Sequence, residues 1–283
     1  MENKLVFNGK DNSFENFDND TNTLTINGIK GDIYHIVFDN YVPNDFVIDI
    51  KNSDITIIEE YKGIIKNAKF NINIDENSKL IRFSILVFNK SRFVVRTNIN
   101  NKGYYQSMQM DLTNNSIDSV ENINLEKEKA YALVIDGIYA IDKAQKTYQT
   151  NINHYAPFST SKAQIFAVNN DFAKVSIYTD AYIKNKAIGT KTQQEGRIIN
   201  LSDNCTGIVL PNLHIDENDV EASHSCSVGS VNKDHLYYLQ TRGLTSLQAR
   251  NILIKGYFNP LLENVKDEKI KEKLNKILDK RIG

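Results

Sequence analysis

Residues 211–258 read PNLHIDENDVEASHSCSVGSVNKDHLYYLQTRGLTSLQARNILIKGYF, and the character of the chain changes within this stretch. Its first part, PNLHIDENDVEAS, alternates apolar and polar residues as the last strands of a sheet would. The segment SVGSVN is predicted to be a turn, in which Gly229 supplies backbone freedom. Asp234 then caps a short predicted helix, HLYYLQT, and Thr245 with Gln248 forms the capping box of a second helix. The stretch therefore joins a strand-rich body to a helical tail.

The body, from Thr23 to about Val209, consists of one predicted strand after another. The strands are TLTING, DIYHIVF, DFVIDI, DITIIEE, AKFNINI, LIRFSILVF, RFVVRTNI, GYYQSMQMDL, AYALVIDGIYAI, AQIFAVNN, AKVSIYTDAYI and GRIINL. Most alternate apolar and polar residues, and β-branched or aromatic residues dominate them. This pattern is compatible with a sandwich, a barrel or a solenoid. Asn27–Gly28 predicts one hairpin, but few other tight hairpin signals follow, which favours stacking from rung to rung.

The sequence divides into three predicted parts. Residues 1–22 are polar and patternless and are expected to form a flexible N-terminal arm. Residues 23–233 form the strand-rich core, and residues 234–283 form a C-terminal helical domain. Within that domain, Asn259–Pro260 is expected to break a helix. A further helix then presents one apolar face, which contains Ile270, Leu274, Ile277 and Leu278, and an opposite solvated face of Lys and Glu.

Composition excludes several classes of protein. The 283 residues carry 34 basic and 35 acidic side chains, so no global field attracts nucleic acid or an anionic membrane. Only Cys205 and Cys226 are present, which argues against a disulfide framework. The first residues, MENKLVFNGK, lack the apolar region of a signal peptide, and no apolar run approaches the ~20 residues that span a bilayer. We therefore expect a cytoplasmic protein with no nucleic-acid or membrane partner.

Three segments carry a resemblance to a known family. HYAPFSTSKAQIF at 154–166 and AIGTKTQQEGRIINLSDN at 187–204 precede the stretch quoted above, which contains the most distinctive motif. The positions that match the family's pattern in that motif are Pro211, Leu213, Ile215, Asp219, Val220, Ser223, His224, Gly229, Leu236, Tyr238, Leu239, Arg242, Gly243 and Ala249. Together the segments resemble the SufB/SufD family, the scaffold proteins of Suf-type iron–sulfur cluster assembly. Ala222 stands where that family often has cysteine, Ser225 where it has glycine, and Asp180 at a further glycine position.

The resemblance implies a fold, and it covers one part of the chain more strongly than the rest. The family's core is a right-handed parallel β-helix, so we expect an all-β core of this kind followed by a short C-terminal helical domain. The match is strong from His154 to Phe258 and only general before it. Known members usually have a longer N-terminal part, and this chain is expected to be an N-terminally shortened, SufD-like member.

The resemblance also implies a function. We expect a non-catalytic scaffold subunit, not an enzyme, that forms a β-helix dimer with a SufB-like partner. A SufC-like ABC-type ATPase is expected to dock on the helical tail, through YYLQTRGLTSLQARNILIKGYF. The chain itself has no G-x-x-x-x-G-K-[ST] phosphate loop. A homodimer through the same edge is the nearest alternative.

His224 is the sharpest site candidate, because imidazole suits iron and zinc and His224 lies in the family's most distinctive motif. Cys226 follows two residues later, and residues i and i+2 of a strand share a face, so both side chains can address one metal. The alternatives are a histidine satisfied by a neighbouring rung and a cysteine that packs as a small hydrophobe. Two cysteines cannot supply the four thiolates of a stable cluster. We therefore expect His224 and Cys226 to hold a transient iron–sulfur cluster whose other ligands come from a partner chain.

Two other classes of protein remain open at this point. A β-helix enzyme that acts on acidic polysaccharide needs a cleft of paired carboxylates, and usually a secretion signal. A purely structural β-solenoid needs neither His224 nor an ATPase. The acidic residues Asp216, Glu217, Asp219 and Glu221 can attract iron, but a solvated charged face explains them equally.

Overall fold

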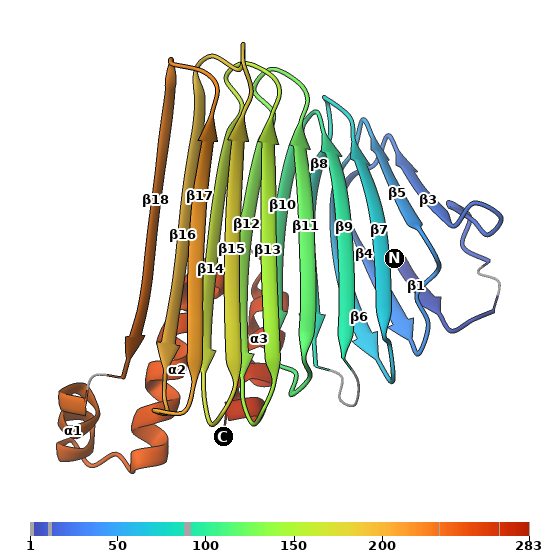
Figure 1. Ribbon diagram of the computed structural model, residues 1–283. Coiled ribbons are helices and arrows are strands. Elements are labelled where there is room, and N and C mark those ends of the chain that lie inside the picture. Colours follow the sequence, from blue (N-terminus) through green and yellow to red (C-terminus); the bar gives the residue numbers. More distant parts are fainter. Residues whose placement is uncertain (1–2, 11–12, 88–91, 232, 266, 283) are drawn as a thin grey trace.

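The computed structural model describes residues 3–10, 13–87, 92–231, 233–265 and 267–282, which form a two-sheet solenoid and three helices (Figure 1). Sheet A contains, in spatial order, β1 (Asn3–Phe7), β4 (Lys30–Asp39), β6 (Asp54–Lys62), β8 (Lys79–Leu86), β10 (Tyr104–Asp111), β12 (Tyr131–Ala140), β14 (Thr160–Asn169), β16 (Thr190–Asn200) and β18 (Val220–Ser230). Sheet B contains β17 (Thr206–Ile215), β15 (Lys174–Ile183), β13 (Gln145–His154), β11 (Ile117–Leu125), β9 (Phe93–Asn101), β7 (Asn67–Ile74), β5 (Phe46–Lys51), β3 (Thr23–Asn27) and β2 (Phe17–Asp18). The predicted parallel β-helix is confirmed.

From β3 onward, successive strands alternate between the two sheets, so each of these strands pairs with the strand one turn away. The pairing is parallel throughout the described strands except between β2 and β3. The hairpin predicted at Asn27–Gly28 is wrong, because β3 and the following β4 belong to different sheets. Gly28 has a φ of 73° and turns the chain across the solenoid instead. Few tight hairpin signals were present because almost every connection is such a crossing.

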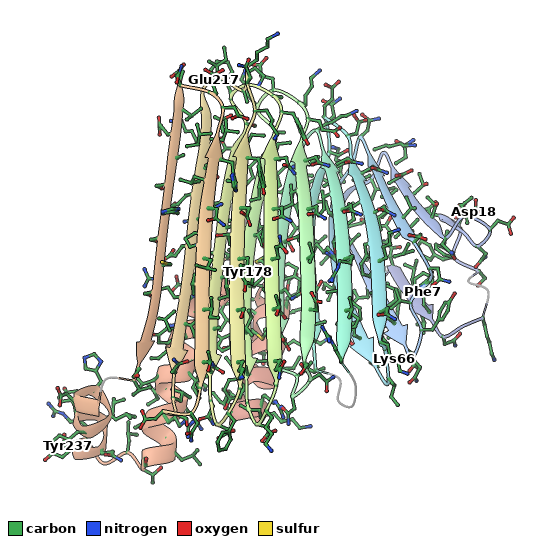
Figure 2. The ribbon with its side chains drawn as sticks, in the orientation of Figure 1. Phe7, Asp18, Lys66, Tyr178, Glu217 and Tyr237 are labelled. Carbon is green, nitrogen blue, oxygen red and sulfur yellow. The ribbon has the colours of Figure 1, made fainter. Side chains whose placement is uncertain are left out.

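Aromatic rings close the N-terminal end of the solenoid. The ring of Phe7 lies 4.9 Å from that of Phe17 and 5.2 Å from that of Phe46, measured between centroids, and Phe38 stacks on its other side at 5.6 Å. Figure 2 shows Phe7 within this first turn. The prediction of a flexible arm over residues 1–22 is wrong for β1, which pairs with β4 and buries Leu5 and Phe7. Burial of these two side chains outweighs the entropy of ordering so short a strand.

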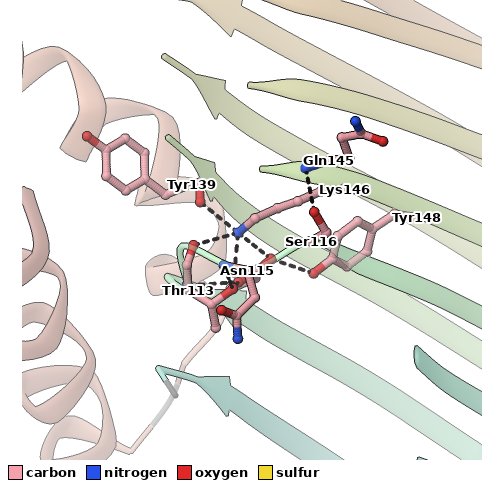
Figure 3. A network of polar contacts seen from close by, with 8 residues as sticks. Thr113, Asn115, Ser116, Tyr139, Gln145, Lys146 and Tyr148 are labelled. Atoms are coloured by element: carbon pink, nitrogen blue, oxygen red, sulfur yellow. Dashed lines mark hydrogen bonds and ion pairs between the residues drawn. The ribbon is translucent and has the colours of Figure 1, made fainter. Parts of the chain in front are cut away.

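The interior contains a buried ion pair in its middle turns (Figure 3). Lys146 and Asp111 are both fully buried, with 2.7 Å between Nζ and Oδ2. The Lys146 ammonium also donates to the carbonyl oxygens of Thr113 at 2.9 Å and Tyr139 at 2.8 Å, and the Tyr148 hydroxyl donates to Asp111 Oδ2 at 2.9 Å. Burial lowers the pKa of Lys146, and the Asp111 carboxylate opposes that shift. Three acceptors thus satisfy the three ammonium protons in a site closed to solvent.

Two ladders of asparagine side chains run along the outer face of sheet B. In one ladder, Nδ2 donates to Oδ1 from Asn98 to Asn71 (3.2 Å), Asn122 to Asn98 (3.0 Å) and Asn151 to Asn122 (2.7 Å). The parallel ladder runs from Asn100 to Asn73 (2.9 Å), Asn124 to Asn100 (3.1 Å) and Asn153 to Asn124 (3.1 Å). In-register parallel strands place identical side chains above one another, so the amides within each ladder, such as those of Asn98 and Asn122, both donate and accept.

The helical tail covers the outer face of sheet A. Its helices are α1 (Lys233–Thr241), α2 (Ser246–Glu263) and α3 (Glu268–Ile282). Phe258 packs closely on Gly137 of β12, where an added Cβ would stand 2.8 Å from the Phe258 ring. Ile254, Leu261, Leu274 and other apolar residues of α2 and α3 join it in a second core with outward-facing residues of the sheet. The predicted capping box at Thr245 and Gln248 is confirmed.

Two local predictions in this region are wrong. Pro260 does not break the helix, because α2 continues to Glu263 with Pro260 inside it. Packing of Phe258 before the proline and Leu261 after it offsets the hydrogen bond that proline removes. The expected turn at Gly229 is also absent, since Gly229 lies within β18 opposite Ile199 of β16 and the strand runs to Ser230.

Candidate functional site

The two last strands, β17 and β18, form an open end of the solenoid. Each is the outermost strand of its sheet, so among the described strands each pairs on one side only. Figure 1 shows β18 as the last strand of sheet A, with no further turn beyond it. An edge strand of this kind presents unpaired N–H and C=O groups. The open end therefore contrasts with the aromatic cap at the opposite end.

His224 and Cys226 project from β18 toward the interior side of sheet A. Their register partners in the neighbouring strand β16 are Gln194 and Gly196. The register partners of these two residues in the next strand, β14, are Ala163 and Ile165, which belong to the buried core. Both side chains are exposed because no further turn covers them. The i, i+2 spacing places them on one face, as the sequence predicts.

The opposite wall of the open end is apolar. Val209, Pro211, Leu213 and Ile215 of β17 project inward, and a Cβ on Gly196 would lie 2.4 Å from Val209 Cγ1. Glycine at position 196 therefore allows the two sheets to approach closely beneath Cys226. Below His224, the Gln194 amide donates to the carbonyl oxygen of Asn212 at 3.3 Å, whereas its buried Oε1 has no hydrogen-bond partner.

An imidazole and a thiol side by side can supply two ligands to a soft or borderline metal. No group of three or more His, Cys, Asp or Glu residues able to hold a metal occurs within the described parts of the chain. A metal or cluster bound at His224 and Cys226 therefore takes its remaining ligands from another molecule.

Two other histidines, His154 and His214, lie in surroundings that are separate from this site. His154 is buried, and its Nδ1 and Nε2 lie 2.8 Å from Ser159 Oγ and 2.9 Å from Ser161 Oγ. Burial lowers the pKa of His154 to about 4, so the ring is neutral and structural. His214 lies on the outer face of β17, with Nε2 3.2 Å from Asp180 Oδ1 and its ring stacked on Tyr182 at 4.3 Å.

Cys205 and the acidic cluster are not part of the site. Cys205 precedes β17, partly buried, with its sulfur 3.7 Å from the Asp171 carbonyl oxygen. Glu217, at the turn between β17 and β18 (Figure 2), accepts from the backbone N–H groups of Asn218 and Lys186, both at 2.9 Å, which lowers its pKa. Glu221 pairs with Lys191 at 2.7 Å. These carboxylates fix turns and edges and do not converge on His224.

The apolar side chains of the helical tail that were expected to anchor a partner fall into a buried group and an exposed group. Ile254 and Phe258 are buried against sheet A and are closed to any partner. Tyr237, Tyr238 and Leu247 are 70%, 55% and 55% exposed, and Figure 2 shows Tyr237 on α1 at the periphery of the molecule. Large apolar side chains exposed together mark an interaction surface. None of the described helices is long and apolar enough to cross a membrane.

Comparison with known proteins places this architecture in a family. Residues 40–257 match the family described as "SUF system FeS cluster assembly, SufBD core domain". The iron–sulfur cluster assembly protein SufD of Bacillus subtilis is 25% identical over 244 residues, which cover 82% of this chain and 55% of that protein. SufD of Plasmodium berghei is 24% identical over 241 residues, 83% of this chain and 18% of the relative.

A SufBD family protein of Synechocystis is 21% identical over 243 residues, 79% of this chain and 53% of its own length. The chain thus spans about half the length of the Bacillus and Synechocystis proteins, and a smaller share of the Plasmodium protein. The match covers the solenoid from β5 to its open end at β18, together with α1 and most of α2. The chain belongs to the SufBD family of iron–sulfur cluster assembly proteins.

Proposed function

We propose that this chain is a non-catalytic scaffold subunit on which an iron–sulfur cluster is assembled in the cytoplasm. The cluster is cargo, held transiently by His224 and Cys226 together with ligands of a partner chain. The partner is a second β-helix, SufB-like, that joins edge to edge at the open end. A SufC-like ABC-type ATPase supplies the work of ATP hydrolysis from a separate chain.

One observation carries this proposal: an unpaired edge strand presents an imidazole and a thiol on one face at an uncapped end. Thiolates are the usual ligands of iron–sulfur clusters, and imidazole replaces them in some. An incomplete ligand set suits assembly and release, because a chain that held all ligands would retain its product. Exposure of the inward-facing Ile215 and Val228 at 44% and 46% supports a partner that covers this end.

The second docking surface is the exposed group of Tyr237, Tyr238 and Leu247. These side chains lie on α1 and the start of α2, away from the residues that hold the tail to sheet A. Aromatic anchors surrounded by polar residues are typical of protein–protein contacts. An ATPase bound there is linked through α2 to β12 and β14, the inner strands of sheet A.

The proposal is tested by reconstituting cluster assembly on the complex purified from the native host under anaerobic conditions. His224→Ala should leave the partners bound and lower the iron and sulfide content. His214→Ala is the matched control, because that ring lies on the outer face of the other edge strand. Equal cluster content in wild type and His224→Ala, with the complex intact, would show that the histidine has no part in assembly.

A further inference from the structure

The middle turns of the solenoid enclose more negative than positive charge. The inward-facing charged residues of the described strands β6 to β13 are four acids and two cations: Glu59, Asp111, Glu121 and Asp136, and Arg82 and Lys146. Arg82 donates to Glu59 from Nε at 2.7 Å and from Nη2 at 2.9 Å. Lys146 pairs with Asp111. Among these residues, Glu121 and Asp136 therefore remain without a cation that donates to them.

Glu121 is placed to carry a negative charge. It faces the interior from β11, and its register partners, Thr97 of β9 and Thr150 of β13, are both buried. The Tyr105 hydroxyl donates to Glu121 Oε1 at 2.7 Å. Burial raises the pKa of Glu121, whereas the nearby Arg82 charge and the Tyr105 hydrogen bond oppose that shift. Glu121 thus has both a donor and a neighbouring positive charge that stabilise its ionised form.

Asp136 has no such donor. It faces the interior from β12 and is 6% exposed, with Gln109 of β10 and Ile165 of β14 as its register partners. Within the described parts of the chain, no hydrogen bond or ion pair reaches its carboxylate. Burial raises the pKa of Asp136 well above its usual range, and the Glu121 charge adds to that shift. A buried carboxylate without a donor is costly while it is charged, and protonation removes that cost.

One small cavity joins the two acids. Glu121 and Asp136 both line it, and its volume of about 20 Å³ suits a single water molecule. The hydroxyl-bearing residues around it, which can donate and accept, are Thr97, Ser107, Ser119, Tyr148 and Thr150. Arg82 lines the same cavity, so a metal ion there would lie beside a guanidinium. A proton neutralises one carboxylate without that repulsion.

We propose that Asp136 and Glu121 form an interior proton-binding site, in which protonated Asp136 donates to the Glu121 carboxylate through one water molecule in the cavity. The pair then holds one proton and one negative charge, because two neighbouring carboxylates do not ionise together in a closed site. The two acids titrate as a unit. This inference is independent of the proposed function, since neither acid lies on β17 or β18 at the open end.

The charged and titratable groups that face this pair leave the proton to it. They are Glu59 and Tyr61 of β6, Arg82 of β8, Tyr105 and Asp111 of β10, and Lys146 and Tyr148 of β13. The two cations are engaged with Glu59 and Asp111. Burial raises the pKa of each of the three tyrosines well above its ordinary value, so the tyrosines stay neutral. The inward-facing Thr97 of β9 and Ile165 of β14 do not titrate.

The site makes stability depend on pH in one direction. The unfolded chain loses the Asp136 proton near the ordinary pKa of 3.8, whereas the folded chain keeps it to higher pH. Above that pH the folded state therefore binds the extra proton, and the stability contributed by this group falls as pH rises, until the folded pair ionises. This direction is opposite to the one that His154 produces.

The proton is detected directly by infrared spectroscopy of the purified full-length chain at neutral pH. A protonated carboxyl group gives a C=O stretch that is separate from the carboxylate bands and shifts in D₂O. We expect this band in the wild type and its loss in Asp136→Asn. Asp203→Asn is the matched control, because it changes an exposed acid by the same substitution and should keep the band. A wild-type spectrum without the band, or a band that survives in Asp136→Asn, would overturn the inference.

A second variant keeps the test decisive if Asp136→Asn fails to fold. Glu121→Gln removes the neighbouring negative charge, so the band should titrate away at a pH lower by about one unit or more. An unchanged titration midpoint in Glu121→Gln would contradict a shared site.

Unfolding by guanidinium provides an independent measurement. From about pH 5 to about pH 9 the wild-type midpoint should fall, whereas Asp136→Asn should show a smaller decline and a higher midpoint at the alkaline end. Equal slopes in the two proteins would count against the proton site. Elemental analysis distinguishes the other source of positive charge. One metal ion bound per wild-type chain, and none in Asp136→Asn, would replace the proton with a metal cation and refute the proposal.

Discussion

The Nζ of Lys146 lies 2.7 Å from Oδ2 of Asp111 in the interior of the solenoid, where neither side chain is exposed. Loss of one partner leaves an uncompensated charge that water cannot reach. We expect Lys146→Met to lower the free energy of unfolding by about 3–5 kcal/mol, measured by guanidinium denaturation. Lys191→Met is the control, because its pair with Glu221 is exposed and contributes little. A similar small change for both variants would contradict the buried role of Lys146.

The lowered pKa of His154 predicts that the protein loses stability in mild acid. Its folded pKa of about 4 lies below the unfolded value of 6.5, so the unfolded state takes up the proton first. Stability is therefore complete above about pH 6.5 and is lost as pH falls toward 4, by at most about 3 kcal/mol from this group. His154→Gln should flatten this part of the pH profile of unfolding. Parallel profiles for wild type and His154→Gln would refute the assignment.

The contact between Phe258 and Gly137 predicts how the tail is held. Phe258→Ala removes a fully buried ring from the second core and should destabilise the tail by about 3–5 kcal/mol. Limited proteolysis should then cleave within α2 and α3 before the solenoid. Ile252→Ala, at a side chain 46% exposed, should leave cleavage unchanged. Equal protection of both variants would show that other residues hold the tail.

The exposed anchors predict where the ATPase docks. Tyr237→Ala and Leu247→Ala should each weaken binding of the SufC-like ATPase about tenfold or more, as interface hot spots do, while unfolding is unchanged. Affinity is measured by calorimetry or surface plasmon resonance. Point variants are the right tool here, because removal of the tail would expose Phe83, Met108 and Leu133 of sheet A and confound the result. Wild-type affinity in both variants would place the ATPase elsewhere.

The sequence predicts the solenoid and the change to helix because both rest on periodicity and on a motif. The face shared by His224 and Cys226 also follows from spacing alone. Pro260 was misread because local propensity cannot register the packing of Phe258 and Leu261 on a sheet far away in the chain. The Lys146–Asp111 pair escapes prediction for a similar reason, since these two residues are 35 positions apart in the sequence and become neighbours only once the turns stack. The signal in the sequence is that both charged residues occupy positions of their strands that face the interior of the solenoid.

The aromatic cap around Phe7 has a consequence for assembly. A solenoid with two open ends can add copies without limit and grow into a fibre. Phe7, Phe17, Phe38 and Phe46 fill the interior of the first turn, although β1 and β2 are also the outermost strands of their sheets, whereas Ile215 and Val228 remain exposed at the other end. The two ends therefore differ in the side chains that they offer, and association driven by the burial of apolar side chains favours the end formed by β17 and β18.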